Sequence, residues 1–360
     1  MFCRLVSTPS PSGQEADVAK LIMHELSRRG VTAKQDGSKA FTNSNSGNVI
    51  ATIPGGKRRL TFIAHMDTVE VGDRRIKPTV RGGVIRSDGS TILGADNKAG
   101  VAPLICALGE IVQMSKRPTV TGIFSTREEQ GTMGVGYLPK GNNGDLVFVL
   151  DSEGDVGGFI HKALGSRLFD VEIIGKEAHA ALNPEKGANA VKAAGLIITS
   201  LKLGRRSHSS ILNIGMISGG RKRNIVPGSA TLSCGARAFD EKTIRSAINE
   251  VDAAAKRACK ATGCRYRIRM ITDDGAPTFE VNPDSSVVKI ARSAAKNLGL
   301  KFSISSRMAT FEANILAAKG YRPLVMCHGG KLPHSTSEVL KVSDLAATKS
   351  MMVELARLSA

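Results

Sequence analysis

Acidic side chains and a histidine follow several short apolar segments in the first half of the chain. The segments have the composition of buried strands and comprise residues 60–64, 91–93, 119–125 and 146–150. The polar residues that come after them are His65 and Asp67, then Asp96, then Glu128 and Glu129, and finally Asp151. A single acid after a strand is most often a helix cap or a turn residue. Four such positions in succession, with a histidine among them, predict a metal site at the carboxyl ends of strands.

The spacing of these residues indicates different tasks for neighbouring side chains. His65 and Asp67 are two positions apart, so on a strand they would point to the same side, and Asp67 could orient the His65 ring. Glu128 and Glu129 are adjacent and would point in different directions. One could bind a metal ion while the other faces the water molecule to be activated. Ligands of these types suit zinc, cobalt or manganese.

The order of the predicted elements indicates two domains. Residues 1–161 and 273–360 contain apolar strands that alternate with helical segments, as expected for an α/β domain. Residues 162–272 instead have the order β-α-β-β-α-β, which is the split βαβ arrangement of ferredoxin-like domains. We therefore expect an α+β domain that is inserted into the α/β domain and separates its two segments in the sequence.

Two local patterns predict how the first domain begins and how it leads to Asp96. Ser12 and Glu15 have the spacing of a capping box that opens a helix. The segments 84–86 and 91–93 flank Ser-Asp-Gly, which predicts a hairpin immediately before Asp96.

Composition excludes several classes of protein. The 360-residue chain has no apolar run as long as a membrane span, and we expect no signal peptide because its N-terminus has too few apolar residues for one. Its six cysteines are scattered, which is typical of reduced thiols and favours a cytoplasmic location. The formal charge of +18 could attract nucleic acid, but the chain has no tryptophan and only 4% aromatic residues, so stacking platforms for bases are missing. We expect neither a nucleic-acid partner nor a membrane partner.

Longer motifs connect these residues with a known family. They are AHMDTV (64–69), DGSTILGADNKAGVA (88–102), STREEQGTMG (125–134), VLDSEG (149–154), GKEAHAALNPEKGANAV (175–191), GMISGGRKRNIVP (215–227) and HSTSE (334–338). Together and in this order, they make the chain resemble the M20 family of zinc metallopeptidases, most closely its peptidase T-like (tripeptide aminopeptidase-like) branch. The resemblance implies a zinc-exopeptidase-type mixed sheet flanked by helices, with an inserted ferredoxin-like lid and dimerisation domain.

The resemblance also implies two divalent metal ions, which are expected to be zinc, with cobalt or manganese as alternatives. One ion would be held by His65, Asp96 and Asp151, and the other by Asp96, Glu129 and His334, so that Asp96 bridges them. His328 could compete with His334 as a ligand, but HSTSE fits the terminal pattern of the family, and we expect His328 to line the pocket.

Further roles follow from the same resemblance. Asp67 would orient the His65 ring, and Glu128 would be the general base and acid. His179, in the AHA motif, would reach into the active site of a partner subunit in a homodimer that forms through the inserted domain. Asn224 and Arg237 match positions that bind a substrate carboxylate, for which the arginine fork is suited. On the residues alone, His179 would be a loop histidine and Arg237 a surface residue.

The predicted activity is hydrolysis of short peptides by a metal-dependent exopeptidase of the aminopeptidase type. Asp151 stands where carboxypeptidase-type relatives carry glutamate, which favours this reading over an N-acyl-amino-acid amidohydrolase or a carboxypeptidase. A non-catalytic basic binding protein is a more distant alternative. Residues 309–314 read ATFEAN, whereas the peptidase T-like branch carries a GGSDAN-type segment there. Glu312 keeps the acid, and the bulkier neighbours leave the exact specificity open.

Overall fold

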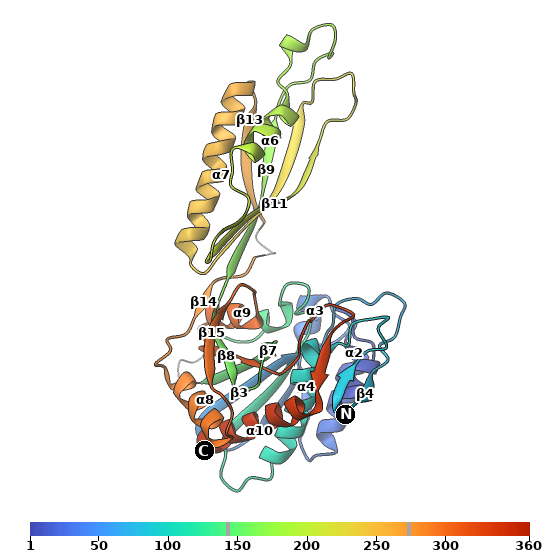
Figure 1. Cartoon of the computed structure of the whole chain (residues 1–360), viewed down its shortest axis with the longest axis vertical. Helices are drawn as coiled ribbons and strands as arrows, with labels where there is room; N and C mark the ends of the chain where they lie inside the picture. Colours follow the sequence, from blue (N-terminus) through green and yellow to red (C-terminus); the bar gives the residue numbers. More distant parts are fainter. Residues whose placement is uncertain (142–144, 272–274) are drawn as a thin grey trace. The chain divides into compact units, whose positions relative to one another are not determined.

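The chain folds into two compact units in the computed structural model, which describes residues 1–141, 145–271 and 275–360 (Figure 1). Unit 1 comprises Met1–Lys162, Phe279–Arg307 and Phe311–Ala360, and unit 2 comprises Ala163–Thr278 and Met308–Thr310. Unit 2 is thus inserted into the sequence of unit 1. The predicted boundary between residues 272 and 273 lies outside the described residues.

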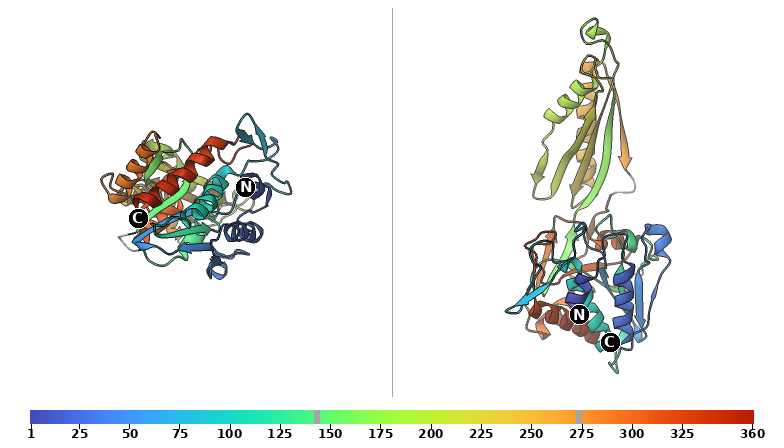
Figure 2. Two further views of the ribbon diagram at one scale, coloured as in Figure 1. Left: turned by 90° about the horizontal axis from the view of Figure 1, so that it is seen from below. Right: turned by 90° about the vertical axis from the view of Figure 1, so that its right-hand side faces the viewer.

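A nine-stranded mixed sheet forms the centre of unit 1 (Figure 2). Its order is β1-β2-β6-β3-β7-β16-β8-β14, with β15 paired to β8. The strands are β1 (Ala33–Gln35), β2 (Val49–Ile53), β3 (Gly56–His65), β6 (Pro118–Ser125), β7 (Leu146–Ser152), β8 (Gly158–Ala163), β14 (Phe279–Glu280), β15 (Ser303–Arg307) and β16 (Pro323–Cys327). Because β6, β3, β7 and β16 are adjacent and parallel, their carboxyl ends lie at one edge of the sheet.

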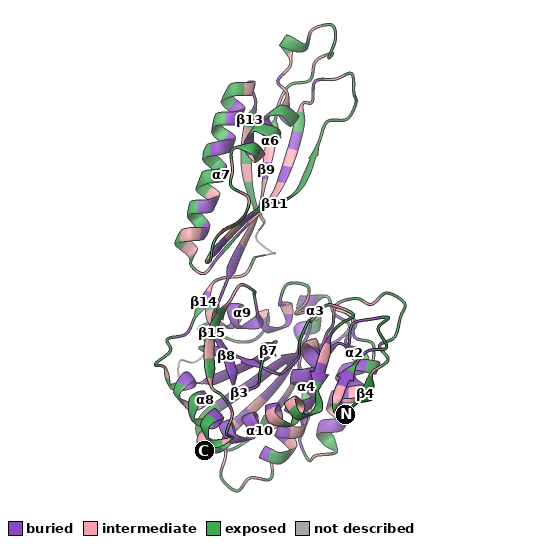
Figure 3. Cartoon of the chain, in the orientation of Figure 1, coloured by how far each residue is buried: buried purple, intermediate pink, exposed green. Residues whose placement is uncertain are grey.

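Helices cover the sheet of unit 1 and bury its central strands, as every residue of β7 and the second half of β3 are largely inaccessible (Figure 3). The helix α4 packs against β3, β6 and β7, and α10 packs against α4 and α8. The helices are α1 (Phe2–Ser7), α2 (Ala16–Ser27), α3 (Ser38–Thr42), α4 (Ala95–Ile111), α5 (Met133–Gly136), α8 (Ser286–Asn297), α9 (Glu312–Ala318) and α10 (Val342–Leu358). A small antiparallel sheet adds β4 (Thr79–Arg81), β5 (Val84–Arg86) and β17 (Val339–Lys341), with β5 in the middle.

Two local predictions were wrong. Residues 91–93 are not a strand, because the Leu93 amide donates to a buried carboxylate, and β5 pairs with β4 and β17 instead. The predicted capping box is also absent. The Ser12 hydroxyl donates to Asp67, and the Glu15 carboxylate accepts from the Gly13 and Arg127 amides and the Ser44 hydroxyl. Apart from the Gly13 amide, these partners are far away in the sequence, which a local pattern does not reveal.

Unit 2 is a two-layer α+β domain. Its strands are β9 (Gly165–Ile174), β10 (Gly204–Ser207), β11 (Ser210–Gly219), β12 (Ser229–Ala238) and β13 (Arg265–Ile271), in the order β10-β11-β12-β9-β13. Its helices are η1 (Pro184–Lys186), α6 (Ala190–Thr199) and α7 (Glu241–Thr262). The strands β11, β12, β9 and β13 pair antiparallel in the order of a ferredoxin-like domain, and β10 is an additional strand at the edge. This order confirms the predicted fold class.

Alternation along the strands explains why unit 2 has one covered sheet face. Phe169, Val171 and Ile173 of β9 are buried in a core with α6 and α7, whereas the residues between them are more accessible. This period of two is the pattern of a sheet with helices on one side. Among the described residues of both units, no helix combines the length and the apolar character that crossing a membrane requires.

Candidate metal centre

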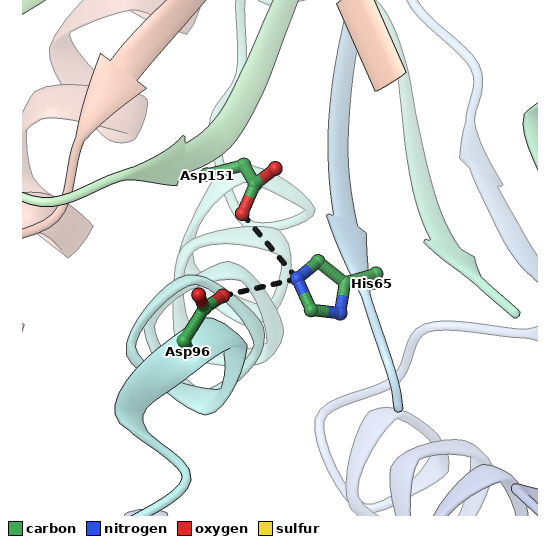
Figure 4. A group of neighbouring side chains, drawn as sticks. All are labelled: His65, Asp96 and Asp151. Carbon is green, nitrogen blue, oxygen red and sulfur yellow. Dashed lines mark hydrogen bonds and ion pairs between the residues drawn. The ribbon is translucent and has the colours of Figure 1, made fainter. Parts of the chain in front are cut away.

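Three predicted ligands meet beside the carboxyl ends of β3 and β7. His65 is the last residue of β3, Asp151 lies near the end of β7, and Asp96 belongs to the first turn of α4. The Nε2 atom of His65 is 3.1 Å from Oδ1 of Asp96 and 3.3 Å from Oδ1 of Asp151 (Figure 4). The three residues therefore form a group that could hold one metal ion.

A second group uses the other side of Asp96. The Nε2 atom of His334 is 2.9 Å from Oε1 of Glu129 and 3.4 Å from Oδ2 of Asp96. Glu129 follows β6, and His334 belongs to the segment between β16 and β17. Asp96 thus directs Oδ1 toward one group and Oδ2 toward the other, and this arrangement suits a carboxylate shared by two cations.

A close approach of helix to strand brings Asp96 to Asp151. At Gly100, one turn after Asp96, a Cβ atom would lie 2.6 Å from the carbonyl oxygen of Leu150. Any larger residue would push α4 away from β7. The glycine in the NKAG segment therefore sets how closely the first turn of α4 can lie to the end of the strand.

Asp67 lies behind the His65 ring. Its Oδ1 atom is 3.2 Å from Nδ1 of His65, and the carboxylate accepts hydrogen bonds from the Ser12 hydroxyl and from the amides of Glu128 and Glu129. Burial opposes the charge of Asp67, but the hydrogen bonds from His65 and Ser12 hold its pKa below the usual value. Asp67 can therefore fix the orientation of His65 and of the backbone that carries both glutamates.

Negative charge accumulates around Glu128. This half-buried residue has a carboxylate oxygen within 4.8 Å of ligand atoms of His65 and Glu129. Burial, followed by the charge of Asp151, raises the pKa of Glu128 well above its ordinary value. Burial also raises the pKa of Asp151 to about 7. The charges of Asp96 and Glu129 raise this pKa further, whereas His65 lowers it. Crowded carboxylates next to imidazoles are the donor set that a divalent cation would compensate, so the residues fit divalent metal ions.

Comparisons with known proteins agree with this arrangement. The sequence pattern of the M20 peptidase dimerisation domain matches residues 163–263. The uncharacterised protein YqjE of Bacillus subtilis is 31% identical over 98% of this chain and 96% of its own. The crystal structure of the aminopeptidase PepT from Bacillus cereus has a TM-score of 0.90 at 30% identity, covering 99% of this chain and 96% of that one. A tripeptidase from Staphylococcus aureus has a TM-score of 0.89 at 28% identity, with coverage of 99% and 96%.

The chain belongs to the M20 peptidase family, in its peptidase T-like branch. It is accordingly a hydrolase of peptide bonds, as the sequence predicted. The family fold also agrees with the two units described above, since the match to the dimerisation domain falls within unit 2.

The remaining predicted site residues of this M20 peptidase lie in unit 2. His179 and Asn224 are exposed neighbours, because a backbone bridge joins His179 to Ile225 and the Ala180 amide donates to the Asn224 carbonyl. The Nδ1 atom of His179 accepts from the amides of Ala181 and Leu182, so Nε2 of the neutral ring carries the proton and can act as a donor. Arg237 lies on β12 and is exposed.

His328 lies near the M20 metal centre but in neither ligand group. It is buried, its Nδ1 atom accepts from the Gly330 amide, and burial lowers its pKa to about 4. The ligand groups among the described residues include His334 instead.

Four further buried or half-buried residues lie around the site and were not among the predicted site residues. Lys98 is fully buried, and its Nζ atom donates to the Ser10 hydroxyl and to the Met66 carbonyl, between His65 and Asp67. Burial lowers the pKa of Lys98 to about 8. The others are Ser12, which donates to Asp67, Glu338, which accepts from the Leu93 amide, and Glu312. Burial raises the pKa of Glu312 to about 8, and the charges of His65 and Asp151 act on it. A lone lysine among the small apolar residues of α4 was the available signal for Lys98, and the HSTSE motif was the signal for Glu338.

Proposed function

We propose that this M20 peptidase is a two-metal aminopeptidase that acts on short peptides with a free N-terminus. The observation that carries the proposal is the position of Asp96, whose two carboxylate oxygens face two separate groups of ligands. The first group adds His65 and Asp151, and the second adds Glu129 and His334. Similarity over nearly the whole chain to an aminopeptidase and to a tripeptidase supports this class of substrate.

The proposed cofactors are two zinc ions, with cobalt or manganese as alternatives. When bound, such ions would polarise the scissile carbonyl and lower the pKa of the attacking water. Imidazole and carboxylate donors in a partly buried site are consistent with each of these metals.

The side chains would carry out the proton transfers. Glu128, which lies outside the two groups that share Asp96, would accept the proton of the attacking water and later donate it to the leaving amine. Asp67 would keep His65 in the orientation that metal binding needs. The amides of Glu128 and Glu129 both donate to the Asp67 carboxylate, so Asp67 would also help to position the backbone of the proposed general base.

The same proposal includes a homodimer that forms through unit 2. The match to a peptidase dimerisation domain supports it. His179 of one subunit would donate a hydrogen bond to the oxyanion formed in the site of its partner. Asn224, beside His179, and Arg237 would bind the substrate carboxylate. All six cysteines are free, which is consistent with the reducing environment of a cytoplasmic enzyme.

A peptide panel would test the substrate class. Di- and tripeptides with free, N-acetylated or C-amidated ends would be followed by mass spectrometry after chelation and again after adding back zinc, cobalt or manganese. We expect metal-dependent release of the N-terminal residue from peptides with a free N-terminus only. Cleavage of acetylated peptides would favour an amidohydrolase or carboxypeptidase, and the absence of hydrolysis with every metal would contradict the proposal.

A further inference from the structure

A buried carboxylate, Glu338, accepts hydrogen bonds from three backbone amides around the bridging aspartate. Its Oε2 atom lies 2.7 Å from the Leu93 amide nitrogen and 2.7 Å from that of Gly94. Its Oε1 atom lies 2.9 Å from the amide nitrogen of Asp96. The side chain belongs to a residue that is 2% exposed, so water does not compete for these bonds. Both oxygens are already occupied by donors, and the ligand groups of the described residues do not include Glu338.

The three amides need this acceptor. Residues 91–93 pair with no strand, and Gly94, with a φ of 71°, turns the chain into the first turn of α4. The amides at the start of a helix have no partner within the helix. A buried amide without an acceptor costs about 1–3 kcal/mol, and a charged acceptor is stronger than a neutral one. Glu338 therefore holds the backbone on both sides of Ala95 and fixes where the Asp96 side chain begins.

Glu338 also belongs to the segment that carries His334. Its own amide donates to the Ser335 carbonyl at 3.1 Å, which closes a turn directly after His334. The Ser335 hydroxyl donates to the Leu332 carbonyl at 2.8 Å. On the other side, β17 begins at Val339 and pairs with β5. The turn is thus anchored at both ends, and its carboxylate reaches the loop that precedes Asp96.

These contacts join two distant segments of the second ligand group. Asp96 and His334 must keep the 3.4 Å approach between Oδ2 and Nε2 if one ion is to contact both. The hydrogen bonds of the Glu338 carboxylate connect the backbone around Asp96 with the segment that carries His334.

We propose that Glu338 is the positioning residue that sets the bridging geometry of Asp96 relative to His334, so that both metal ions depend on it without contacting it. This inference depends on the two-metal site proposed above. Since both ions would be bound by Asp96, loss of Glu338 weakens the binding of both. The affinity for the ion between Asp96, Glu129 and His334 falls more, because Glu338 anchors the segments of two of its three ligands.

The test compares Glu338→Gln with the matched control Glu354→Gln. Glutamine has the size of glutamate but only one acceptor oxygen, so at least one amide would face an NH2 group. Glu354 is also buried and paired, with Asn297 and Arg357, on α10. Zinc binding would be measured by competition with a chromophoric chelator. Hydrogen exchange of metal-free protein would be followed by mass spectrometry in fragments that span residues 91–97.

We expect Glu338→Gln to bind zinc about 10–100-fold more weakly, as for other residues that orient metal ligands. We also expect exchange in residues 91–97 to become about tenfold faster or more, since the amides lose their acceptor. Glu354→Gln should match the wild type in both measurements. Unchanged zinc affinity or unchanged exchange in Glu338→Gln would overturn the inference.

Two further results keep this inference separate from the proposed function and from simple misfolding. A wild-type protein that binds no metal would contradict the proposed function itself. A folded variant is also needed. If Glu338→Gln does not fold, Glu338→Asp, which keeps the charge on a shorter side chain, takes its place with the same two criteria. Wild-type exchange in residues 91–97 at the rate of an unstructured chain would overturn the inference without any variant.

Discussion

The Oδ1 atom of Asp67 lies 3.2 Å from Nδ1 of His65, while the Nε2 atom of the same ring faces Asp96 and Asp151. The ring is therefore held from behind by one carboxylate and presents its other nitrogen to the proposed metal. Replacement of Asp67 by asparagine should weaken metal binding about 10–100-fold and lower kcat. The amide group of asparagine cannot accept from Ser12 and from both glutamate amides as the carboxylate does. Metal titration and steady-state kinetics would measure both effects.

Ser12→Ala provides the graded comparison for Asp67→Asn. It removes one hydrogen bond from Asp67 and leaves the carboxylate and its other donors in place. We expect a smaller loss of metal affinity than in Asp67→Asn. Equal losses in the two variants, or wild-type affinity in Asp67→Asn, would show that Asp67 does not act through His65.

Glu128→Gln should separate metal binding from catalysis. We place Glu128 outside both ligand groups, so the variant should retain its metal ions. The turnover should fall by about 10²–10⁴-fold or more, because glutamine cannot accept the proton of the attacking water. Metal content after dialysis and kcat on the best peptide of the panel would be measured together. Near-normal turnover would exclude Glu128 as the general base.

Mixed dimers would test whether His179 acts on the partner's site. His179→Ala and Glu128→Gln would be co-expressed with different affinity tags, and the mixed dimer would be purified through both. If His179 acts across the dimer, one site of the mixed dimer combines an intact Glu128 with the partner's intact histidine. The mixed dimer should then be far more active than either parent variant. Activity no higher than that of the parents would place His179 in the site of its own subunit, or in neither.

The buried carboxylate of Glu25 should contribute a pH-dependent part of the stability. Hydrogen bonds from Arg29 and Arg4, at 2.7 Å each, lower its pKa against the effect of burial. Because the folded pKa is lowered, the contribution is fully present above the unfolded pKa of about 4.3. It is lost as the pH falls through the lower folded pKa. Glu25→Gln should therefore reduce the free energy of unfolding by about 1 kcal/mol near neutral pH.

Urea unfolding of wild type and variant between neutral and acidic pH would measure this difference. The gap should close as the solution becomes acidic. Glu110→Gln is the control, since Glu110 pairs with Lys349 at a more exposed position and should have a smaller effect. If the difference in free energy of unfolding between the wild type and Glu25→Gln stays constant down to low pH, the stabilisation does not come from the charge of Glu25.

Much of this arrangement could be predicted from the sequence, for a physical reason. His65, Glu129 and Asp151 follow or end parallel strands, and the carboxyl ends of parallel strands meet at one edge. The type of each residue then indicated metal chemistry. The structure brings these residues together with Asp96 and His334, and their binding of metal stays a prediction. The fold class was also predictable, since alternation and element order define the ferredoxin-like unit.

The supporting contacts could not be predicted, because they depend on the conformation of loops. Ser12 has the spacing of a capping box, yet its hydroxyl donates to Asp67. The apolar segment 91–93 has strand character, but its amides donate to the carboxylate of Glu338. Lys98 is charged and still fully buried, because two oxygens from other segments accept its hydrogen bonds. In each case, the decisive partner lies far away in the sequence.

Anomalous diffraction at the zinc edge, from crystals grown with zinc, would locate the proposed metal ions directly. We expect two peaks for each chain, one between His65, Asp96 and Asp151 and the other between Asp96, Glu129 and His334. The Asp96 carboxylate should lie between the two peaks. A single peak, or peaks that do not share Asp96, would contradict the proposed dinuclear centre.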